Sequence, residues 1–491
     1  MLKERSGGIG WAKWLKYVII FLLPVVMVLL LRTQVDNDSW FVLAEGREIV
    51  QNGVYKTDVL SMHEGLEVVV QNYGFAVVYW LIYSVLGLAG LYVGMILMYV
   101  LVEFLLYKIF KLVSEENEVL TLILMTIASV LLGVLFATTR AQMVSYVIFL
   151  TVIYILERYV KKGEKKWLVA IPFLSLVQIN LHGSVWLMLF LAMGAFILDS
   201  RLENYKAEPL VITAVVAFVV GLINPYGIDM ILFVIRSYSG GTIQKLVSEM
   251  QPFDLGAWYN WVLYGAIAMV ILMGFYGKGK DVRARYLMMF IGLLGLGLNT
   301  MKGMSQVILV MFLPVVGMYR KAVFPKLKNP KAIRGVFWGE VVLAVVTVGV
   351  FGWALKRDLA GLREAPDDAL VEAVSIIDEE VAPEERKAAK VYTGYNDGGY
   401  LEFRGYRPYL DPRAEVFLEV NNKKEDILTE YIDLREGRGD KEEFLKKYEF
   451  DYLVVRGEYD LFYADEVEGF ERIFADEETQ TRLYRRAESV I

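Results

Sequence analysis

Apolar segments of membrane-spanning length recur along most of this chain. A helix needs about 20 apolar residues to cross the hydrocarbon core of a bilayer. The chain is 56% hydrophobic, which is too apolar for an ordinary soluble protein of 491 residues. We therefore predict a mostly α-helical polytopic membrane protein with about eleven transmembrane helices. The expected spans are 17–34, 91–110, 118–136, 142–157, 167–181, 185–198, 208–223, 258–276, 286–300, 304–319 and 335–355.

Lysine and arginine residues predict how these helices are oriented. With the N-terminus inside the cell, basic residues gather in the inner loops and are sparse in the outer loops. The positive-inside rule then places the N-terminus in the cytoplasm, and an odd number of spans places the C-terminal region outside. A further apolar stretch lies at 73–88. If it crossed the membrane, every later loop would change sides and the asymmetry of basic residues would be lost. We interpret this stretch as a re-entrant or interfacial helix within the first outer loop, about 32–90.

The composition changes sharply near residue 356, where the chain becomes acidic and less apolar. We predict a transmembrane domain at 1–355 and a small extracytoplasmic α/β domain at 356–491. The second part is long enough to bury a small core. Its expected strands are 391–394, 400–403 and 451–455, with a closing hairpin over 471–485, and its expected helices are 368–380 and 423–447.

The residue inventory argues against several kinds of site. The chain has no cysteine, so it has no disulfide, thiolate metal site or cysteine nucleophile. Its two histidines, His63 and His182, are too few for a histidine-rich metal site. The inner loops are short and basic and contain no glycine-rich phosphate loop, which argues against a nucleotide-using site inside the cell. We predict no cofactor and no bound metal, and no nucleic-acid partner.

Polar and charged residues gather in the outer loops instead. Asp36 and Asp38 follow the first apolar segment directly, at the point where the chain leaves the bilayer. An acid is costly in the membrane interior, but at the outer mouth of a helix bundle it can meet both a lipid headgroup and water. Paired acids at such a place point to chemistry on a lipid-linked substrate. The candidate substrate-binding residues in the predicted outer segments are Trp40, Arg140, Asn180, His182, Glu249 and Lys302.

These residue types suit sugar transfer from a polyprenyl phosphate. One carboxylate, Asp36 or Asp38, acts as general base on an acceptor hydroxyl, which attacks the anomeric carbon while the lipid phosphate leaves. Cationic or amide groups must hold that phosphate, and arginine suits bidentate contact. We assign this role to Arg140, His182 and Lys302 by location. Glu249 is a candidate second acid, and Trp40 or Trp186 a candidate platform for sugar stacking.

At these residues the sequence resembles the GT-C-type polytopic membrane glycosyltransferases, most closely bacterial proteins described as mannosyltransferase-like or rhizobial lipopolysaccharide glycosyltransferase-like. The resemblance implies a bacterial plasma-membrane enzyme, a polyprenyl-phosphate or polyprenyl-diphosphate sugar donor, and a base at Asp36 or Asp38. The acceptor is then a glycan, a lipid or a protein. The motifs are Asp36-x-Asp38-x-Trp40-x-x-x-Ala44-x-Gly46, Asn180-Leu181-His182-Gly183, Asn224-Pro225-Tyr226-Gly227, Glu249-Met250-Gln251-Pro252, Tyr395-Asn396-Asp397-Gly398-Gly399-Tyr400-Leu401 and Leu410-Asp411-Pro412-Arg413-Ala414.

The same residues also have structural explanations. Asp36 or Asp38 can cap a helix that starts near Ser39, since aspartate is favoured at helix N-termini. Arg140 can extend its guanidinium from a helix end to the membrane interface. His182 can end a helix, Glu249 can be a solvated loop charge, and the motif at 224–227 can be a helix stop and turn.

Two other functions compete with glycosyl transfer. A transporter or flippase for lipid-linked glycans should carry charged or broken helices near the membrane midplane and a repeated architecture. The sequence contains few charges within the spans, Glu103 and Glu340 being placed near span ends, and we detect no repeat. A non-catalytic envelope assembly protein is the third hypothesis, in which the C-terminal domain binds a partner.

Overall fold

The computed structural model describes residues 16–31, 37–239, 241–252, 260–276, 282–320, 367–457, 460–463 and 466–487. Three expected features lie outside these residues: the acid Asp36, the span 335–355, and the domain boundary at 355/356. We use the name C-terminal domain for the described residues from 367 onward.

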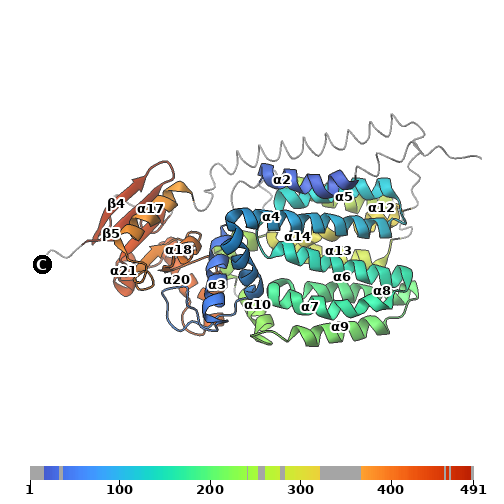
Figure 1. The fold of residues 1–491 in the computed structure, drawn as a ribbon, viewed down its shortest axis with the longest axis horizontal. Coiled ribbons are helices and arrows are strands. Elements are labelled where there is room, and N and C mark those ends of the chain that lie inside the picture. Colours follow the sequence, from blue (N-terminus) through green and yellow to red (C-terminus); the bar gives the residue numbers. More distant parts are fainter. Residues whose placement is uncertain are drawn as a thin grey trace, which may run out of the picture.

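Long helices run side by side in a bundle, and the C-terminal domain sits at one end of it (Figure 1). Helices occupy the expected spans that fall within the described residues. The elements of this part are η2 Val18–Leu22, α2 Leu23–Leu31, α3 Asp38–Asn52, α4 Tyr73–Val113, α5 Glu118–Leu135, α6 Gln142–Lys162, η3 Lys165–Val169, α7 Ala170–Leu181, η4 Gly183–Val185, α8 Met188–Glu203, α9 Glu208–Gly221, α10 Asp229–Ser239, α11 Thr242–Leu246, η5 Ser248–Met250, α12 Asn260–Tyr276, α13 Ala284–Gly297, α14 Met301–Val310 and α15 Leu313–Met318.

Four helical segments in the described chain are long and apolar enough to cross a membrane: Tyr73–Val113, Gln142–Lys162, Gly183–Glu203 and Met301–Met318. Shorter apolar helices such as Glu208–Gly221 and Ala284–Gly297 accompany them. Apolar residues on the outside of the bundle, including Val215 and Val219 of α9, are exposed, as expected of side chains that face lipid. The number of membrane crossings stays a prediction.

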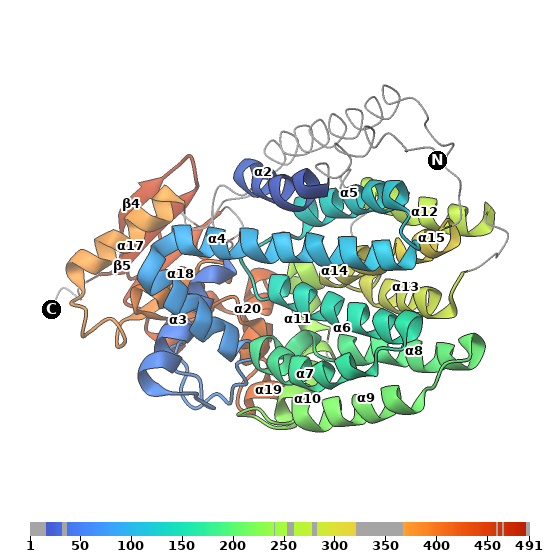
Figure 2. The ribbon, with the colours of Figure 1, turned by 45° about the vertical axis from the view of Figure 1, so that its right-hand side comes forward.

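Helix α4 consists of two helical segments that meet at Gly87, where φ is +62° and ψ is −157°. This conformation favours glycine. The first segment packs closely against α3, because Gly46 leaves room for the backbone of Ala76; a Cβ there would lie 2.1 Å from the Ala76 carbonyl oxygen. Figure 2 shows α3 at the end of the bundle that meets the C-terminal domain. The break at Gly87 agrees with the separate helix expected over 73–88.

The C-terminal domain contains a five-stranded mixed sheet of order β2-β1-β3-β5-β4. β1 is parallel to both β2 and β3, and β5 pairs antiparallel with β3 and β4. The expected strands near 391 and 451 and the expected closing hairpin are all present. The elements are α17 Asp368–Glu380, β1 Lys390–Thr393, α18 Gly398–Arg404, β2 Arg407–Pro408, η7 Ala414–Phe417, α19 Glu419–Asn422, α20 Ile427–Arg435, α21 Lys441–Tyr448, β3 Tyr452–Arg456, β4 Phe470–Asp476 and β5 Thr481–Arg486.

Two expectations for this domain were wrong. The strand expected at 400–403 is the helix α18, which starts at Gly398. Gly398 lies so close to the Leu410 backbone that a Cβ would be 2.0 Å from its carbonyl oxygen, so tertiary packing decides the conformation here. The helix expected over 423–447 is divided into α20 and α21, with Gly437 at φ +75° between them and Asp440 capping α21.

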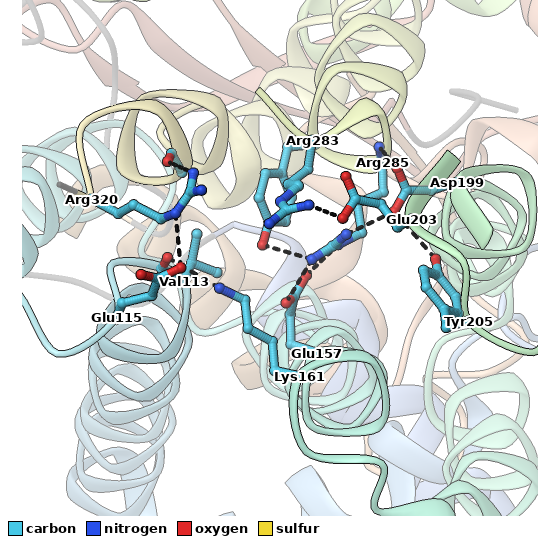
Figure 3. A network of polar contacts seen from close by, with 12 residues as sticks. Val113, Glu115, Glu157, Lys161, Asp199, Glu203, Tyr205, Arg283, Arg285 and Arg320 are labelled. Atoms are coloured by element: carbon cyan, nitrogen blue, oxygen red, sulfur yellow. Dashed lines mark hydrogen bonds and ion pairs between the residues drawn. The ribbon is translucent and has the colours of Figure 1, made fainter. Parts of the chain in front are cut away.

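Buried charges tie the bundle together at the end remote from the C-terminal domain (Figure 3). Arg285 of α13 contacts Glu157 of α6 at 2.7 Å and Asp199 of α8 at 2.7 Å, and none of the three side chains is more than 1% exposed. Glu157 lies fifteen residues beyond the start of α6, about 22 Å along the helix. Glu103 was expected near a span end, but it is fully buried in the interior of α4.

Candidate active site

A hydrogen-bonded contact fixes the start of α3 against the bundle. The hydroxyl groups of Ser39 and Thr139 lie 2.9 Å apart, and the Tyr79 hydroxyl donates to Ser39 Oγ at 2.9 Å. The N-cap of α3 is Asn37, whose side chain makes no capping hydrogen bond; Nδ2 donates instead to the Asn396 carbonyl of the C-terminal domain at 2.5 Å. Asp38 is therefore the first residue of the helix, where a carboxylate is favoured by the helix dipole, rather than its cap.

Because Ser39 meets Thr139, their sequence neighbours Asp38 and Arg140 come together. Arg140 Nη1 lies 3.2 Å from Asp38 Oδ2 and 2.5 Å from Glu249 Oε1, so one guanidinium joins two carboxylates. Burial alone would raise the pKa of Glu249, but Arg140 and Lys302 hold it below its usual value. All the charged groups of this cluster keep some exposure; the Asp38 and Glu249 side chains are 29% and 31% exposed.

Lys302 is brought to this cluster by a backbone contact. The Met301 N–H donates to the Gln251 carbonyl at 2.9 Å, which joins the start of α14 to the segment that carries Glu249. Thr300 caps α14 by accepting a hydrogen bond from the Gly303 N–H. The lysine thus stands at the end of a capped helix, close enough to Glu249 and His182 to affect the pKa of both.

His182 follows the last residue of α7, at the outer end of that helix. Its Nδ1 lies 2.8 Å from Ser145 Oγ, and Gln178 Nε2 donates to both Ser145 Oγ and the His182 carbonyl. Burial, reinforced by the nearby Lys302, lowers the pKa of His182 to about 3. The ring is therefore neutral at physiological pH, so it can offer a ligand a hydrogen bond but no charge.

These residues line one cavity of about 530 Å³. Three parts of the chain form its walls: α3 with the segment after it, the end of the helix bundle that meets the C-terminal domain, and the C-terminal domain itself. The charged and polar lining residues are Asn37, Asp38, Glu45, Gln71, Asn72, Arg140, Gln142, His182, Ser184, Glu249, Lys302, Asn396, Asp397, Arg413, Glu415 and Arg456. The cavity volume is that of a typical small-molecule site.

An ionic contact holds the C-terminal domain against the first outer loop. Arg413 Nη1 donates to Asp58 Oδ1 of that loop at 2.7 Å, while its other nitrogens contact Glu402 and Asp411 within the C-terminal domain. The three acids are completely buried, and the Arg413 side chain is 5% exposed. The cavity therefore depends on the docking of the two parts.

The helices α3 and α18 also pack directly. Trp40 lies edge-on to Tyr400, with ring centroids 5.4 Å apart, and contacts Phe403 at 4.9 Å. Arg47 donates to the carbonyl oxygens of Phe403 and Glu402, both at 2.8 Å. These contacts form an interface in which aromatic burial and satisfied backbone acceptors both stabilise docking.

Glu45 is a lining residue that the sequence analysis did not assign. It lies seven residues after Asp38 on α3, hence on the same face of the helix. It is 2% exposed, and its Oε2 atom has no hydrogen-bond partner among the residues that the structure describes. Burial raises the pKa of Glu45 to about 8; Arg413 opposes this shift, and Asp411, Asp58 and Glu415 add to it. Glu45 is therefore mainly protonated at neutral pH.

The structure brings together Asp38, Arg140, His182, Glu249 and Lys302, all of which were singled out from the sequence. Asn180 and Trp40 are not among the lining residues. The Asn180 side chain donates to the Leu176 and Ile223 carbonyls, and Trp40 packs in the interface with α18. Trp186 is fully buried, with its indole N–H donating to Ser175 Oγ, so it offers no face for sugar stacking.

Five charged lining residues were not predicted from the sequence: Glu45, Asp397, Arg413, Glu415 and Arg456. The motifs around 395 and 410 were noticed, but nothing in the sequence indicated that they would meet the first outer loop. The helical spacing of Asp38 and Glu45 was the available signal for Glu45. Among the residues that the structure describes, no three His, Asp or Glu side chains are close enough together to hold a metal ion.

No protein-family profile matches this sequence, and no curated protein matches it. Solved structures do match in fold. The apo oligosaccharyltransferase of Archaeoglobus fulgidus aligns with a TM-score of 0.58 at 11% identity, over 98% of this chain and 76% of that one. The mycobacterial arabinofuranosyltransferase AftD aligns with a TM-score of 0.55 at 11% identity, over 97% of this chain and 40% of that one.

Both neighbours are named as glycosyltransferases. The likeness at this identity shows a shared fold, which agrees with the general architecture implied by the sequence resemblance. The likeness does not identify the narrower group of bacterial glycosyltransferases that the sequence resembles. The chain therefore shares the fold of these two proteins, and its C-terminal domain forms part of the cavity lining.

Proposed function

We propose that the chain is a membrane glycosyltransferase. It transfers a sugar from a polyprenyl-phosphate donor to an acceptor hydroxyl at the extracytoplasmic face of a bacterial plasma membrane. The observation that carries the proposal is the meeting of Asp38, Arg140, Glu249 and Lys302 around one cavity. That set combines a carboxylate that can act as base with cations that can hold a phosphate. The fold shared with two glycosyltransferases supports the class.

In this proposal Asp38 is the general base, and Asp36 is the alternative. The carboxylate accepts the proton of the acceptor hydroxyl while the hydroxyl oxygen forms a bond to the anomeric carbon. The bond between that carbon and the phosphate oxygen breaks, and the polyprenyl phosphate leaves with the electron pair. The products are the glycosylated acceptor, the lipid phosphate and a protonated carboxyl group.

Arg140 links donor binding to the release of the base. Its guanidinium is shared by Asp38 and Glu249, with Nη1 3.2 Å from Asp38 Oδ2. A donor phosphate that engages the Arg140 N–H groups draws them from Asp38, so this carboxylate is freed to accept the proton of the acceptor hydroxyl when the donor is in place. Glu249 keeps the guanidinium from turning away.

Lys302 and His182 complete the donor contacts in this scheme. Lys302 provides a second positive charge for the phosphate. His182 is neutral, because its pKa is about 3, and it offers a hydrogen bond to the phosphate or to a sugar hydroxyl. Its ring contacts Ser145 Oγ, which is itself held by Gln178, so little conformational entropy is lost on binding.

A transporter of lipid-linked glycans is the second candidate function. Glu103 favours it, because ionisable residues buried among membrane helices commonly mark transport paths. A transport path would require a relay of ion pairs. Within the described chain, no second ionisable group lies beside Glu103 to form one.

The test uses the full chain in nanodiscs with radiolabelled polyprenyl-phosphate sugars and a membrane-glycan extract. Wild type is compared with Asp38→Asn and with Glu48→Gln, an acid on the same helix that does not line the cavity. Loss of a general base should lower transfer or donor hydrolysis by about 100-fold or more. Glu48→Gln should remain active. If the wild-type protein binds donor without turnover, the result would favour transport. If Asp38→Asn keeps full activity, Asp36 would be assigned as the base instead.

A further inference from the structure

The cavity has a wall that is acidic although it contains two arginines. Arg413 and Arg456 both line the cavity, but each is neutralised by carboxylates of the chain itself. Arg413 contacts three buried acids, Asp58, Glu402 and Asp411. Four of its five N–H groups are thereby engaged, so little of its charge remains for a ligand.

Arg456 is held in the same way. It contacts Asp397 at 2.5 Å and also pairs with Asp367, and its side chain is 4% exposed. Two carboxylates therefore face this one guanidinium. Asp397 itself lines the cavity, so the pair presents a carboxylate to any ligand bound there.

Glu415 adds a further negative charge to this wall. It is a half-buried lining residue, and no cation within the described chain lies at ion-pair distance from it. Glu45 lies close enough to Glu415 for the two to interact, and the pKa of Glu45 is raised to about 8. The wall thus combines the side chains of Asp397 and Glu415 with Glu45, which is mainly protonated at neutral pH and can donate a hydrogen bond.

A second part of the cavity lining, contributed by the helix bundle and the start of α3, is different. There Arg140 contacts Asp38 and Glu249, and Lys302 lies near Glu249. Both cations belong to the bundle, at the end where the proposed lipid phosphate would arrive. The two walls differ in what they can recognise. One can hold a phosphate, and the other offers carboxylates that accept hydrogen bonds from hydroxyl or ammonium groups and repel anions.

We propose that the wall formed by Glu45, Asp397 and Glu415 is the acceptor subsite, and that it selects an uncharged or cationic sugar over an anionic one. This inference rests on the proposed function. The hydroxyl to be glycosylated then lies between Asp38 and this wall. Uronate, sulfate or phosphate groups on the acceptor are rejected by the fixed negative charges.

The experiment measures binding of three trisaccharides to the full chain in phosphatidylcholine nanodiscs by ligand-observed NMR. The probes are chitosan trisaccharide, its fully N-acetylated neutral counterpart, and trigalacturonate. Wild type should bind the cationic and neutral probes at least about 10-fold more tightly than the anionic one. Glu415→Lys should reduce this preference about 10-fold or more, and Glu415→Gln should give an intermediate value. Glu419→Lys, an exposed change on α19 outside the cavity, should preserve it.

Tightest binding of trigalacturonate by wild type would overturn the inference, and so would a preference that Glu415→Lys leaves unchanged or a lack of binding by all three probes. Donor hydrolysis, measured separately in wild type and Asp38→Asn, tests the proposed function. If the donor is hydrolysed but the anionic trisaccharide binds most tightly, this inference fails while the proposed function stands. The expected preference without any donor turnover would remove the proposed function and leave the charge selectivity of the wall standing.

Discussion

The hydroxyl groups of Ser39 and Thr139 lie 2.9 Å apart across the junction between α3 and the loop before α6. Each is the sequence neighbour of a charged residue of the cavity, Asp38 and Arg140, whose side chains are 3.2 Å apart. The contact is buried and includes the Tyr79 hydroxyl as a third member. A small polar cluster therefore sets the geometry between the candidate base and the candidate phosphate ligand.

Replacing Ser39 by alanine should disturb that geometry without removing either charged group. The buried hydroxyls of Thr139 and Tyr79 each lose a partner, which typically costs about 1–3 kcal/mol of stability. We expect a lower melting temperature and a reduced kcat for sugar transfer, with Ser39→Thr restoring part of both. Ser84→Ala, which removes an exposed hydroxyl of α4, is the matched control. Unchanged kcat in a destabilised Ser39→Ala protein would show that the cluster is structural only.

Replacing Arg140 by lysine or glutamine separates charge from geometry. Lysine keeps the positive charge but loses the planar fork that contacts Asp38 and Glu249 together. Glutamine also leaves two carboxylates without their shared cation. We expect the KM for the polyprenyl-phosphate donor to rise about 10-fold for lysine, and more for glutamine. Steady-state kinetics at several donor concentrations measure both effects. Equal KM values in all three proteins would place the phosphate elsewhere.

Much of the bundle could be predicted because a helix among lipids carries a local signal. The apolar segments from 91 to 319 each gave a helix where the chain is described, since their length and hydrophobicity are properties of the segment itself. The first strand and the hairpin of the C-terminal domain were predictable for a similar reason. The helix α18 was not, because its conformation depends on Gly398 packing against Leu410, a contact between segments.

The candidate site also contains residues with a local sequence signal and residues that depend on long-range contacts. Asp38, Arg140, His182, Glu249 and Lys302 were found because unusual polar residues stand at the outer ends of apolar segments. The acceptor-side wall was missed because it depends on pairing between distant parts of the chain. Arg413 contacts Asp58 across 355 positions of sequence, and neither residue carries a local signal for the other. Long-range ion pairs of this kind need either a structure or related sequences.

Stability should depend on pH through Glu45. The pKa of Glu45 is about 8 in the folded protein and ordinarily 4.5, so between these limits the folded state holds the proton while the unfolded state releases it. Folding stability is therefore highest below about pH 4.5 with respect to this group and declines as the pH rises toward 8. Glu45→Gln should flatten the decline in melting temperature between pH 5 and pH 8. Glu48→Gln should keep the wild-type dependence, and parallel curves for Glu45→Gln and wild type would contradict the prediction.

The buried network at the far end of the bundle gives the last prediction. Arg285 neutralises Glu157 and Asp199 with almost no access to solvent, so Arg285→Met leaves two buried acids without a cation (Figure 3). Breaking a buried pair in this way costs about 3–5 kcal/mol, whereas removing all of its charges is often neutral. We therefore expect Arg285→Met to lower the melting temperature sharply in detergent. The triple change Glu157→Gln, Asp199→Asn, Arg285→Met should recover most of the loss.

Arg201→Met, an exposed position on α8, is the matched control for loss of a positive charge. A triple variant as unstable as Arg285→Met alone would mean that the ion pairs themselves, rather than the absence of unpaired charge, stabilise the junction of α6, α8 and α13.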